Sequence, residues 1–566
     1  MQDNNTQFKT SLVLNKLEGI YVGFFENVNY MITNYIVKDK HSNMIVAEQA
    51  IIKKDITNLT KVIKMFEYNK LPYNKHALAV ISEKRSDYIN IFYSLDNTIN
   101  INLIKYNDKY SKQLNKDGLD NFKLCAPYGL EQLEPFFSKI TLAYQVKEKL
   151  LSNLGLDRAP KEVQSAVEDF TRGLKDYINT RYHNNLPEQI SNAGCKLWEV
   201  LEVFDDIIPR SGSKTFNVFH IAEAPGNMLI TAKYFAERKR RNITNYDWRA
   251  NSLNPNNTEN KKLFGQYGKI FDDKYGLMKK NYNKWLWGED GTGDITKSAN
   301  IKWFVNYINE KWIGRDGIGG VDSKSKLDFI CGDGGLNSDN DPILLQKLDL
   351  AQVLVVLACS SIGGSCCIKH FTPYIKRHLD TYNASGFFLG FLYLYYLAFE
   401  QVNLFKPYTS NPDSGEFYVV GRGFKGVSET QLNKLYKILD NFEFNNAIIE
   451  KDKIPDSFVS QIVVFLEKIS NLNTIGIEKQ NLLLTCYKSS LEDKHDKYDK
   501  RGKQAHRGRK GKYSKSLSRD NDSRDTESKS AKANKYLECD TFLNESSMQE
   551  ILVPRYKEWI KVYKFV

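Results

Sequence analysis

A strand that ends in an acidic residue and two glycines constrains the fold of this chain most strongly. Residues 327–332 (LDFICG) are mostly apolar or β-prone, and Asp333, Gly334 and Gly335 follow. The pattern predicts a buried strand whose last carboxylate points into a crevice while the backbone turns tightly beneath it. Ligands bind at this carboxyl edge of the strands in open α/β sheets. Similar strand-and-turn patterns recur over residues 207–425, so we predict an α/β domain there.

Two later predicted strands place charged residues in similar positions. Lys369 ends one apolar strand, and Glu416 begins the strand that follows Pro412. We expect the strand of Asp333 to lie between these two in space. A lysine and two carboxylates at strand ends of one sheet indicate an active site rather than a structural accident.

Composition bounds the class of protein. A length of 566 residues predicts two to three domains, and an apolar fraction of 41% is typical of a globular protein. The eight cysteines are scattered, which predicts neither a disulfide framework nor a zinc site. With no secretory signal in the sequence, free thiols predict a reducing, cytoplasmic setting, or a virion if the source is a virus. The fourteen-residue apolar run 386–399 is shorter than the ~20 residues that span a bilayer, so we predict a buried helix and no membrane partner.

The net charge of +12 is concentrated near the carboxyl end. Residues 488–536 hold sixteen Lys or Arg against eight Asp or Glu, and almost no aliphatic residue. Such a segment buries too little apolar area to offset its conformational entropy, which predicts disorder. It is either a solvated linker or a non-specific arm for the phosphate backbone of RNA, and the rest of the chain favours the arm.

Changes in periodicity divide the remaining sequence. Short alternating runs predict strands near the amino end, and helical spacing follows, with helices expected at 131–154 and 160–182. The predicted organisation is an N-terminal α+β domain (1–130), a helical connector (131–190), the α/β domain (191–425), a helical extension (426–487), the disordered basic segment (488–536) and a short C-terminal element (537–566).

The first strand of the α/β domain is predicted at 216–221, with a small-residue turn and then a helix at 229–238. This arrangement places backbone amides and a carboxylate around a bound ligand. The turn lacks a lysine-bearing phosphate loop and a Gly-x-Gly-x-x-Gly pattern, which argues against a nucleoside triphosphatase and a dinucleotide enzyme.

Several segments together resemble a known family. Residues 223–226 (EAPG) resemble the first S-adenosylmethionine motif of the FtsJ-like ribose methyltransferases. Residues 290–296 (DGTGDIT) resemble the adenine-side motif of the branch that methylates eukaryotic or viral mRNA caps. The order of that branch continues through Asp333 and Lys369 to residues 405–420, and the resemblance covers residues 190 to 425.

The resemblance implies a Rossmann-like methyltransferase domain that uses S-adenosylmethionine and no metal. It implies methylation of the ribose 2′-hydroxyl of the first transcribed nucleotide of capped mRNA. The implied catalytic residues are Lys196, Asp333, Lys369 and Glu416. The implied cofactor-binding residues are Ala222, Glu223, Ala224, Pro225, Gly226, Asn227, Asp294, Ile295 and Asp333.

The chemistry of the reaction requires this mixture of side chains. A ribose hydroxyl is a poor nucleophile at neutral pH, and a lysine whose pKa is lowered by burial and by a second ammonium can accept or steer its proton. Carboxylates orient that lysine and favour the positive sulfur of the cofactor. In-line alignment of oxygen, methyl carbon and sulfur supplies most of the remaining acceleration.

Departures from the family pattern leave alternatives open. Asn227 and Met228 stand where glycine and an aromatic residue are usual, and His220 where an acidic residue often ends the first strand. The chain could therefore be an inactive RNA-binding scaffold on a methyltransferase fold, or it could methylate ribosomal RNA. Taken singly, Lys196 could be a solvent-exposed helix residue, and Asp294 could cap a helix.

The residues that would hold a methylated guanine are not evident from sequence, and neither is the oligomeric state. Such a base would be held by stacking and cation–π contact. Three tryptophans near insertions in the domain, each equally suited to a buried core, are candidates: Trp248, Trp285 and Trp287.

Overall fold

The structure is a computed structural model. The described residues are 98–105, 118–153, 155–156, 159–160, 169–186, 188–212, 214–267, 273–313, 327–335, 342–373, 384–474, 476–477, 480, 484 and 545–565. Most of the predicted N-terminal domain (1–130) and all of the basic segment (488–536) lie outside these residues.

The chain divides into two compact units. One comprises Leu95–Leu142, Thr171–Asn473 and Glu558–Val566, and the other comprises Met1–Ser94, Ala143–Phe170 and Thr474–Lys557. The central sheet lies within the first unit, which draws in residues from beyond both ends of the predicted α/β domain.

Eight strands form the sheet, in the order β1-β7-β8-β6-β5-β2-β3-β4. Their bounds are β1 Ile99–Asn102, β2 Thr215–Ile221, β3 Asn245–Asn251, β4 Trp285–Leu286, β5 Phe329–Gly332, β6 Ser365–Phe371, β7 Phe399–Lys406 and β8 Glu416–Phe424. Strands β6, β5, β2, β3 and β4 are parallel, whereas β8 runs antiparallel between β6 and β7. The predicted α/β fold is confirmed.

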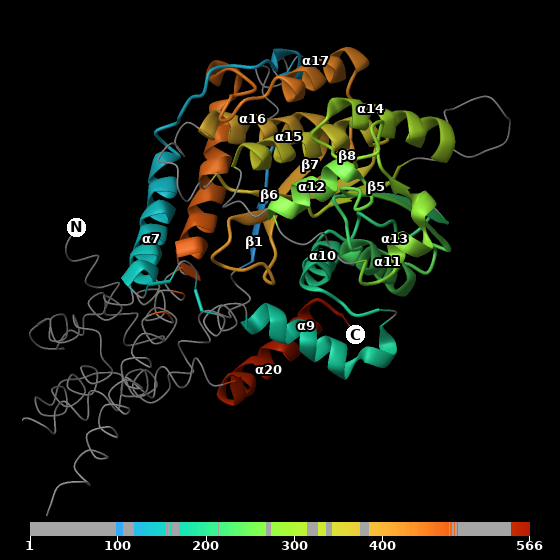
Figure 1. Ribbon diagram of the computed structural model, residues 1–566, viewed down its shortest axis with the longest axis vertical. Helices are drawn as coiled ribbons and strands as arrows, with labels where there is room; N and C mark the ends of the chain where they lie inside the picture. The colour runs from blue at the N-terminus through green and yellow to red at the C-terminus, as the bar shows by residue number, and fades with distance from the viewer. Residues whose placement is uncertain are drawn as a thin grey trace, which may run out of the picture. The chain divides into compact units, whose positions relative to one another are not determined.

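Helices cover both faces of this sheet, as a parallel sheet requires. The helices among the described residues, in both units, have the bounds α7 Glu134–Asn153, α9 Asp169–Arg181, α10 Asn192–Val203, α11 Asn227–Lys239, α12 Thr258–Tyr267, α13 Leu277–Lys280, α14 Ser298–Tyr307, α15 Pro342–Cys359, α16 Ser385–Ala398, α17 Glu429–Asp440 and α20 Glu545–Val562. Helices α14 to α17 gather on one side of the sheet and α10 and α11 on the other (Figure 1). Two helix starts follow sequence signals: Ser191 caps α10, and Ser428 forms a capping box with Gln431 at α17.

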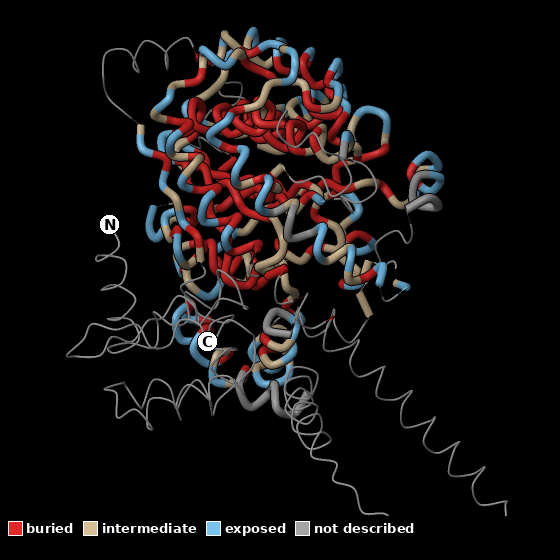
Figure 2. The backbone as a smooth tube through the Cα atoms, turned by 90° about the vertical axis from the view of Figure 1, so that its left-hand side faces the viewer, coloured by how far each residue is buried: buried red, intermediate tan, exposed pale blue. Residues whose placement is uncertain are grey.

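The apolar run at 386–399 is the centre of the core. It forms α16, every residue of which is buried, and its last residue, Phe399, begins β7. Figure 2 shows many buried segments running through the interior, with exposed segments toward the outside. This confirms the predicted buried helix. In the described part of the chain, every helix is too short or too polar to cross a bilayer.

The edge strand β1 corrects the predicted domain organisation. The predicted N-terminal domain includes residues 99–102, yet β1 pairs antiparallel with β7, with Ile99 opposite Lys406. Alternating residues predict a strand but carry no information about which sheet the strand joins, because its partner lies some 300 residues away in the sequence.

Truncation of the buried helix should destabilise the fold strongly. Leu392 is fully buried, so Leu392→Ala should lower the free energy of unfolding by about 2–5 kcal/mol through the cavity it leaves. Ile362 is 75% exposed, and Ile362→Ala should change it by less than about 0.5 kcal/mol. Urea denaturation of both variants measures the difference, and equal losses would show that α16 is not the core.

Candidate active site

The four predicted catalytic residues lie together, in two ion pairs. The Lys369 Nζ atom is 3.1 Å from Asp333 Oδ1, and the Lys196 Nζ atom is 2.6 Å from Glu416 Oε1. Asp333 directly follows β5, Lys369 lies on β6, Glu416 begins β8 and Lys196 comes from α10. The side chains are 10–25% exposed, so they line the edge of the sheet where a ligand can still reach them.

The register of β6 and β8 explains how these pairs meet. Lys369 is the Cα partner of Tyr418, and Phe371 is the partner of Glu416. Since alternate residues of a strand share a face, Glu416 and Tyr418 project on the same side of β8. Tyr418 donates a hydrogen bond of 3.0 Å to Asp333 Oδ1. The expectation that the Asp333 strand lies in the middle was wrong: β6, which carries Lys369, lies between β5 and β8.

Both members of the second ion pair are charged near neutral pH. Burial opposes charge on Glu416, but Lys196 and Lys369 lower its pKa to about 2. Burial likewise opposes the Lys196 ammonium, but the Glu416 and Asp333 carboxylates raise its pKa above the ordinary value. Two lysines, one on α10 and one on β6, therefore hold the Glu416 carboxyl group in its ionised form.

Lys406 is a third buried lysine beside this pair, and the sequence analysis gave it no role. Its ammonium donates to the Ser414 carbonyl at 2.7 Å, to the Glu416 carbonyl at 2.9 Å and to Ser410 Oγ at 3.2 Å. Burial lowers its pKa to about 7. It thereby organises the loop between β7 and β8, and Ser410 Oγ in turn donates to Glu416 Oε1 at 2.8 Å.

Glu199 is a second functional candidate that the sequence analysis missed. It is fully buried on α10, one turn after Lys196. Its carboxylate accepts from the backbone N–H groups of Tyr408 (2.7 Å) and Thr409 (3.0 Å) and from Trp559 Nε1 (2.9 Å). Burial raises the pKa of Glu199 to about 7, although these donors oppose the rise. In the sequence, only the position of Glu199 three residues after Lys196 indicated a place near the site.

The predicted cofactor turn follows β2, with Ala222 at φ 51° and Gly226 at φ 114°. Its carboxylate, Glu223, is buried and accepts from the N–H groups of Met228 (2.8 Å) and Leu229 (3.0 Å), so it binds the start of α11. Ala222, Ala224, Pro225 and Asn227 are partly exposed. Pro225 and Asn227 face an open pocket of about 620 Å³, which the start of α10 also lines.

His220, which stands where the family often has an acidic residue, contacts a buried carboxylate and a tyrosine hydroxyl. His220 is fully buried and lies 3.4 Å from Glu223 Oε2 and 3.0 Å from the Tyr246 hydroxyl. Burial opposes charge on the ring, yet contacts with Cys331 and Glu223 raise the pKa of His220 to about 9. A histidine here compensates the buried carboxylate that supports the turn.

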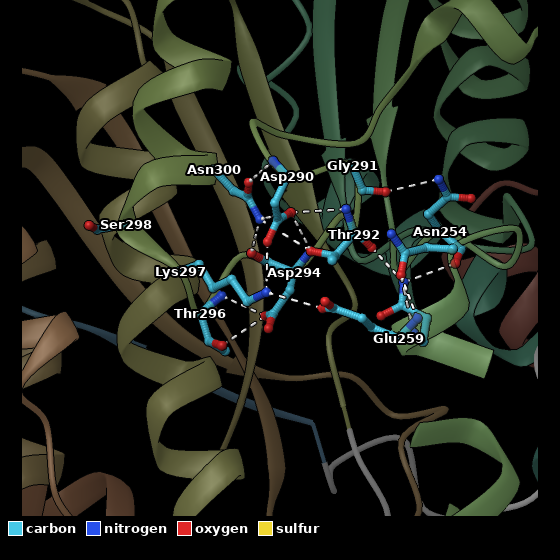
Figure 3. Close-up of polar contacts among 12 residues, drawn as sticks. Asn254, Glu259, Asp290, Gly291, Thr292, Asp294, Thr296, Lys297, Ser298 and Asn300 are labelled. Atoms are coloured by element: carbon cyan, nitrogen blue, oxygen red, sulfur yellow. Dashed lines mark hydrogen bonds and ion pairs between the residues drawn. The ribbon is translucent and has the colours of Figure 1, made fainter. Parts of the chain in front are cut away.

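The predicted adenine-side loop is fixed by its own polar residues (Figure 3). Asp290 accepts from the Thr292 N–H and hydroxyl, from Asn300 Nδ2 at 3.0 Å and from Lys297 Nζ at 2.6 Å. Burial opposes its charge, but these bonds hold the pKa of Asp290 well below its usual range. Asn254 Nδ2 binds the Gly291 carbonyl at 2.9 Å, which fastens the loop to the chain just beyond β3.

Asp294 lies within this loop and is partly exposed. Its Oδ1 atom accepts from the N–H (2.9 Å) and hydroxyl (2.7 Å) of Thr296. Its other carboxylate oxygen makes no hydrogen bond to a described residue. Asp294 forms a turn ahead of α14 and does not cap it, since the residue before the helix is Lys297. Ile295 is buried, so it supports the loop from beneath.

Two of the three candidate tryptophans belong to the core. Trp248 and Trp285 are buried in one apolar cluster, with ring centroids 6.5 Å apart. Trp287 stacks on Trp285 at 6.1 Å and is partly exposed. Burial removes Trp248 and Trp285 as stacking platforms for a base. Within the described ranges, no cluster of three His, Cys, Asp or Glu side chains is arranged to hold a metal ion.

Comparisons with known proteins agree with this geometry. Residues 189–424 match the FtsJ-like methyltransferase family. A protein of Acanthamoeba polyphaga mimivirus, named uncharacterized protein L511, is 32% identical over 319 residues, which are 55% of this chain and 34% of that protein.

Two vertebrate relatives have functional names. Cap-specific mRNA (nucleoside-2′-O-)-methyltransferase 2 of Pongo abelii is 28% identical over 301 residues, covering 51% of this chain and 35% of that protein. Cap-specific mRNA (nucleoside-2′-O-)-methyltransferase 1 of Danio rerio is 36% identical over 155 residues, covering 27% and 16%. The chain thus spans about a third or less of the length of these relatives. The match confirms the expected resemblance: residues 189–424, less than half of this chain, match the FtsJ-like methyltransferase family.

Proposed function

We propose that this protein transfers a methyl group from S-adenosylmethionine to the ribose 2′-hydroxyl of the first transcribed nucleotide of capped mRNA. The observation that carries the proposal is the pairing of Lys369 with Asp333 beside Lys196 and Glu416, at the carboxyl edge of the sheet. The names of the vertebrate relatives support the cap as the substrate.

The residues around this edge fit an adenosyl cofactor. Gly293 passes so close to the chain just beyond β3 that a Cβ there would lie 1.8 Å from the Ser252 carbonyl oxygen, and a Cβ at Gly335 would lie 3.0 Å from Lys369 Nζ. Glycine at 293 lets the loop pack against that backbone, and glycine at 335 leaves room beside the Lys369 ammonium. The free carboxylate oxygen of Asp294 can accept from an adenine amino group. Ala222 to Asn227 would line the methionine end. The cofactor would supply a methyl group on a positively charged sulfur.

The side chains on hand suit activation of a hydroxyl group. Asp333 orients the Lys369 amine, and Tyr418 fixes Asp333 in turn. Lys369 would hold the 2′-hydroxyl and receive or steer its proton, which needs the amine in its neutral form. Lys196, paired with Glu416, adds positive charge beside the Lys369–Asp333 pair. Alignment of the hydroxyl by these fixed groups lowers the entropic part of the barrier.

The proposed partners are capped mRNA and, through the basic segment 488–536, its phosphate backbone. An inactive scaffold is not favoured, because burying two lysines and two carboxylates carries a desolvation cost that a non-catalytic protein has no reason to retain. Ribosomal RNA is not favoured either, since the named relatives are cap-specific.

Loss of the Lys369 amine should stop methyl transfer. For Lys369→Ala we expect turnover on capped RNA to fall by about 10²–10⁴-fold, the usual worth of general acid–base catalysis. Cofactor affinity, measured by calorimetry, should survive. The matched control is Lys302→Ala, an exposed lysine of α14, which should retain full activity. Turnover of the Lys369 variant within a few-fold of the unsubstituted protein would remove Lys369 from the proposed role.

The carboxylate oxygen of Asp294 that does not bind Thr296 should accept a hydrogen bond from the adenine amino group. Asp294→Asn keeps an oxygen for Thr296 but presents an amide N–H₂ to the ligand, so the cofactor dissociation constant should rise about tenfold or more. Thr296→Ala weakens the turn without touching that oxygen and should have the smaller effect. Calorimetry on both variants tests this, and unchanged binding by Asp294→Asn would place the adenine site elsewhere.

A further inference from the structure

The end of the chain packs against the helix that carries Lys196. Trp198 of α10 donates its Nε1–H to the Tyr563 carbonyl at 2.8 Å, and its ring lies 4.5 Å from that of Phe565. Trp198, Trp559 and Phe565 are fully buried. Lys239 of the neighbouring helix α11 also donates to the Lys564 carbonyl, at 2.5 Å. Residues 559–565, here called the C-terminal latch, therefore belong to the core of the methyltransferase unit.

Glu199 joins this latch to the loop that precedes β8. One carboxylate oxygen accepts from Thr409 N at 3.0 Å and from Trp559 Nε1 at 2.9 Å, and the other accepts from Tyr408 N at 2.7 Å. Three donors from two distant parts of the chain converge on a carboxylate that has no access to solvent. A buried carboxylate bonded in this way fixes all of its partners, since releasing any one leaves a polar group unsatisfied.

The contacts close a ring around the second catalytic ion pair. Tyr408 and Thr409 lead directly to Ser410, whose hydroxyl donates to Glu416 at 2.8 Å. Glu416 pairs with Lys196 at 2.6 Å, and α10 returns the chain from Lys196 to Glu199 within one turn. A shift at Glu199 would move both the loop and the helix that hold this pair.

From this ring we infer that Glu199 is a positioning residue for methyl transfer, and that the C-terminal latch acts through it to align Lys196 and Glu416. The inference rests on the proposed function. Neither Glu199 nor Trp559 would contact the substrate, because both are fully buried behind the site. Their contribution is to geometry, and misplacement of catalytic groups by about 1 Å can cost ~10²-fold in rate.

The test begins with Glu199→Gln in the full-length protein. The amide group keeps the size of the carboxylate but sets an N–H₂ against either Tyr408 N–H or the Thr409 and Trp559 donors. We expect kcat on capped RNA to fall ~10- to 100-fold, with KM for RNA and the cofactor dissociation constant within about twofold of the unsubstituted values. The control is Glu237→Gln on α11, an exposed residue that loses a 3.7 Å ion pair with Lys233 and touches neither the ring nor the latch; its kcat should be unchanged.

The second variant, Trp559→Phe, removes the N–H donor and keeps an aromatic ring in the core. It should lower kcat in the same direction as Glu199→Gln, and the double variant should lose less than the product of the single losses because the two residues act through one contact. Independent losses that multiply would overturn the role of the latch.

A readout that needs no catalysis separates the possible outcomes. Amide hydrogen exchange at Tyr408 and Thr409 should accelerate in Glu199→Gln and stay slow in Glu237→Gln. Unchanged kcat for Glu199→Gln in an active protein would overturn the inference, as would equal losses of kcat and of cofactor affinity, which signal general unfolding. If the unsubstituted protein fails to methylate RNA, the proposed function fails. Faster exchange at Tyr408 and Thr409 in Glu199→Gln would then show only that Glu199 holds the loop in place.

Discussion

The antiparallel pairing of β8 with β6 is the constraint on which the site depends. It sets Glu416 and Tyr418 beside Lys369, and Tyr418 links Lys369's partner Asp333 back to β8. A one-residue slip of β8 would turn every one of its side chains to the opposite face. The register is held by the wholly buried middle of β8, residues 417–420, packed between β6 and β7.

Burying ionisable groups costs folding free energy in this arrangement, and hydrogen bonds to those groups offset the cost. Lys406 is fully buried and donates to two carbonyls and a hydroxyl, and Glu199 accepts from three N–H groups. Removing one partner from such a network leaves a charge uncompensated, which is costlier than never having buried the pair. The loop between β7 and β8 is therefore rigid for an electrostatic reason, and rigidity is what a positioned lysine requires.

The sequence was sufficient for the α/β fold and for three of the four residues in the ion pairs, because Asp333 and Glu416 stand at strand ends and Lys369 stands near the end of an apolar strand, two residues before its last residue, Phe371. Lys196 needed the family resemblance, since a lysine on a helix has no distinctive pattern. Glu199 and Lys406 were missed because their partners are mainly backbone groups and, for Glu199, lie more than 200 residues away. The sequence could not predict the order of β5, β6 and β8 or the pairing of β1 with β7. Periodicity predicts strands but does not indicate which strands are neighbours.

The central claim is that this edge of the sheet methylates the first transcribed nucleotide of a capped RNA. The most direct measurement is transfer of labelled methyl from S-adenosylmethionine to two transcripts of identical sequence, one with a methylated guanosine cap and one with a 5′-triphosphate. The modified nucleotide is then mapped by nuclease digestion and mass spectrometry. We predict label on the 2′-oxygen of the first nucleotide of the capped transcript alone. Equal labelling of both transcripts, or label at an internal nucleotide, would contradict it.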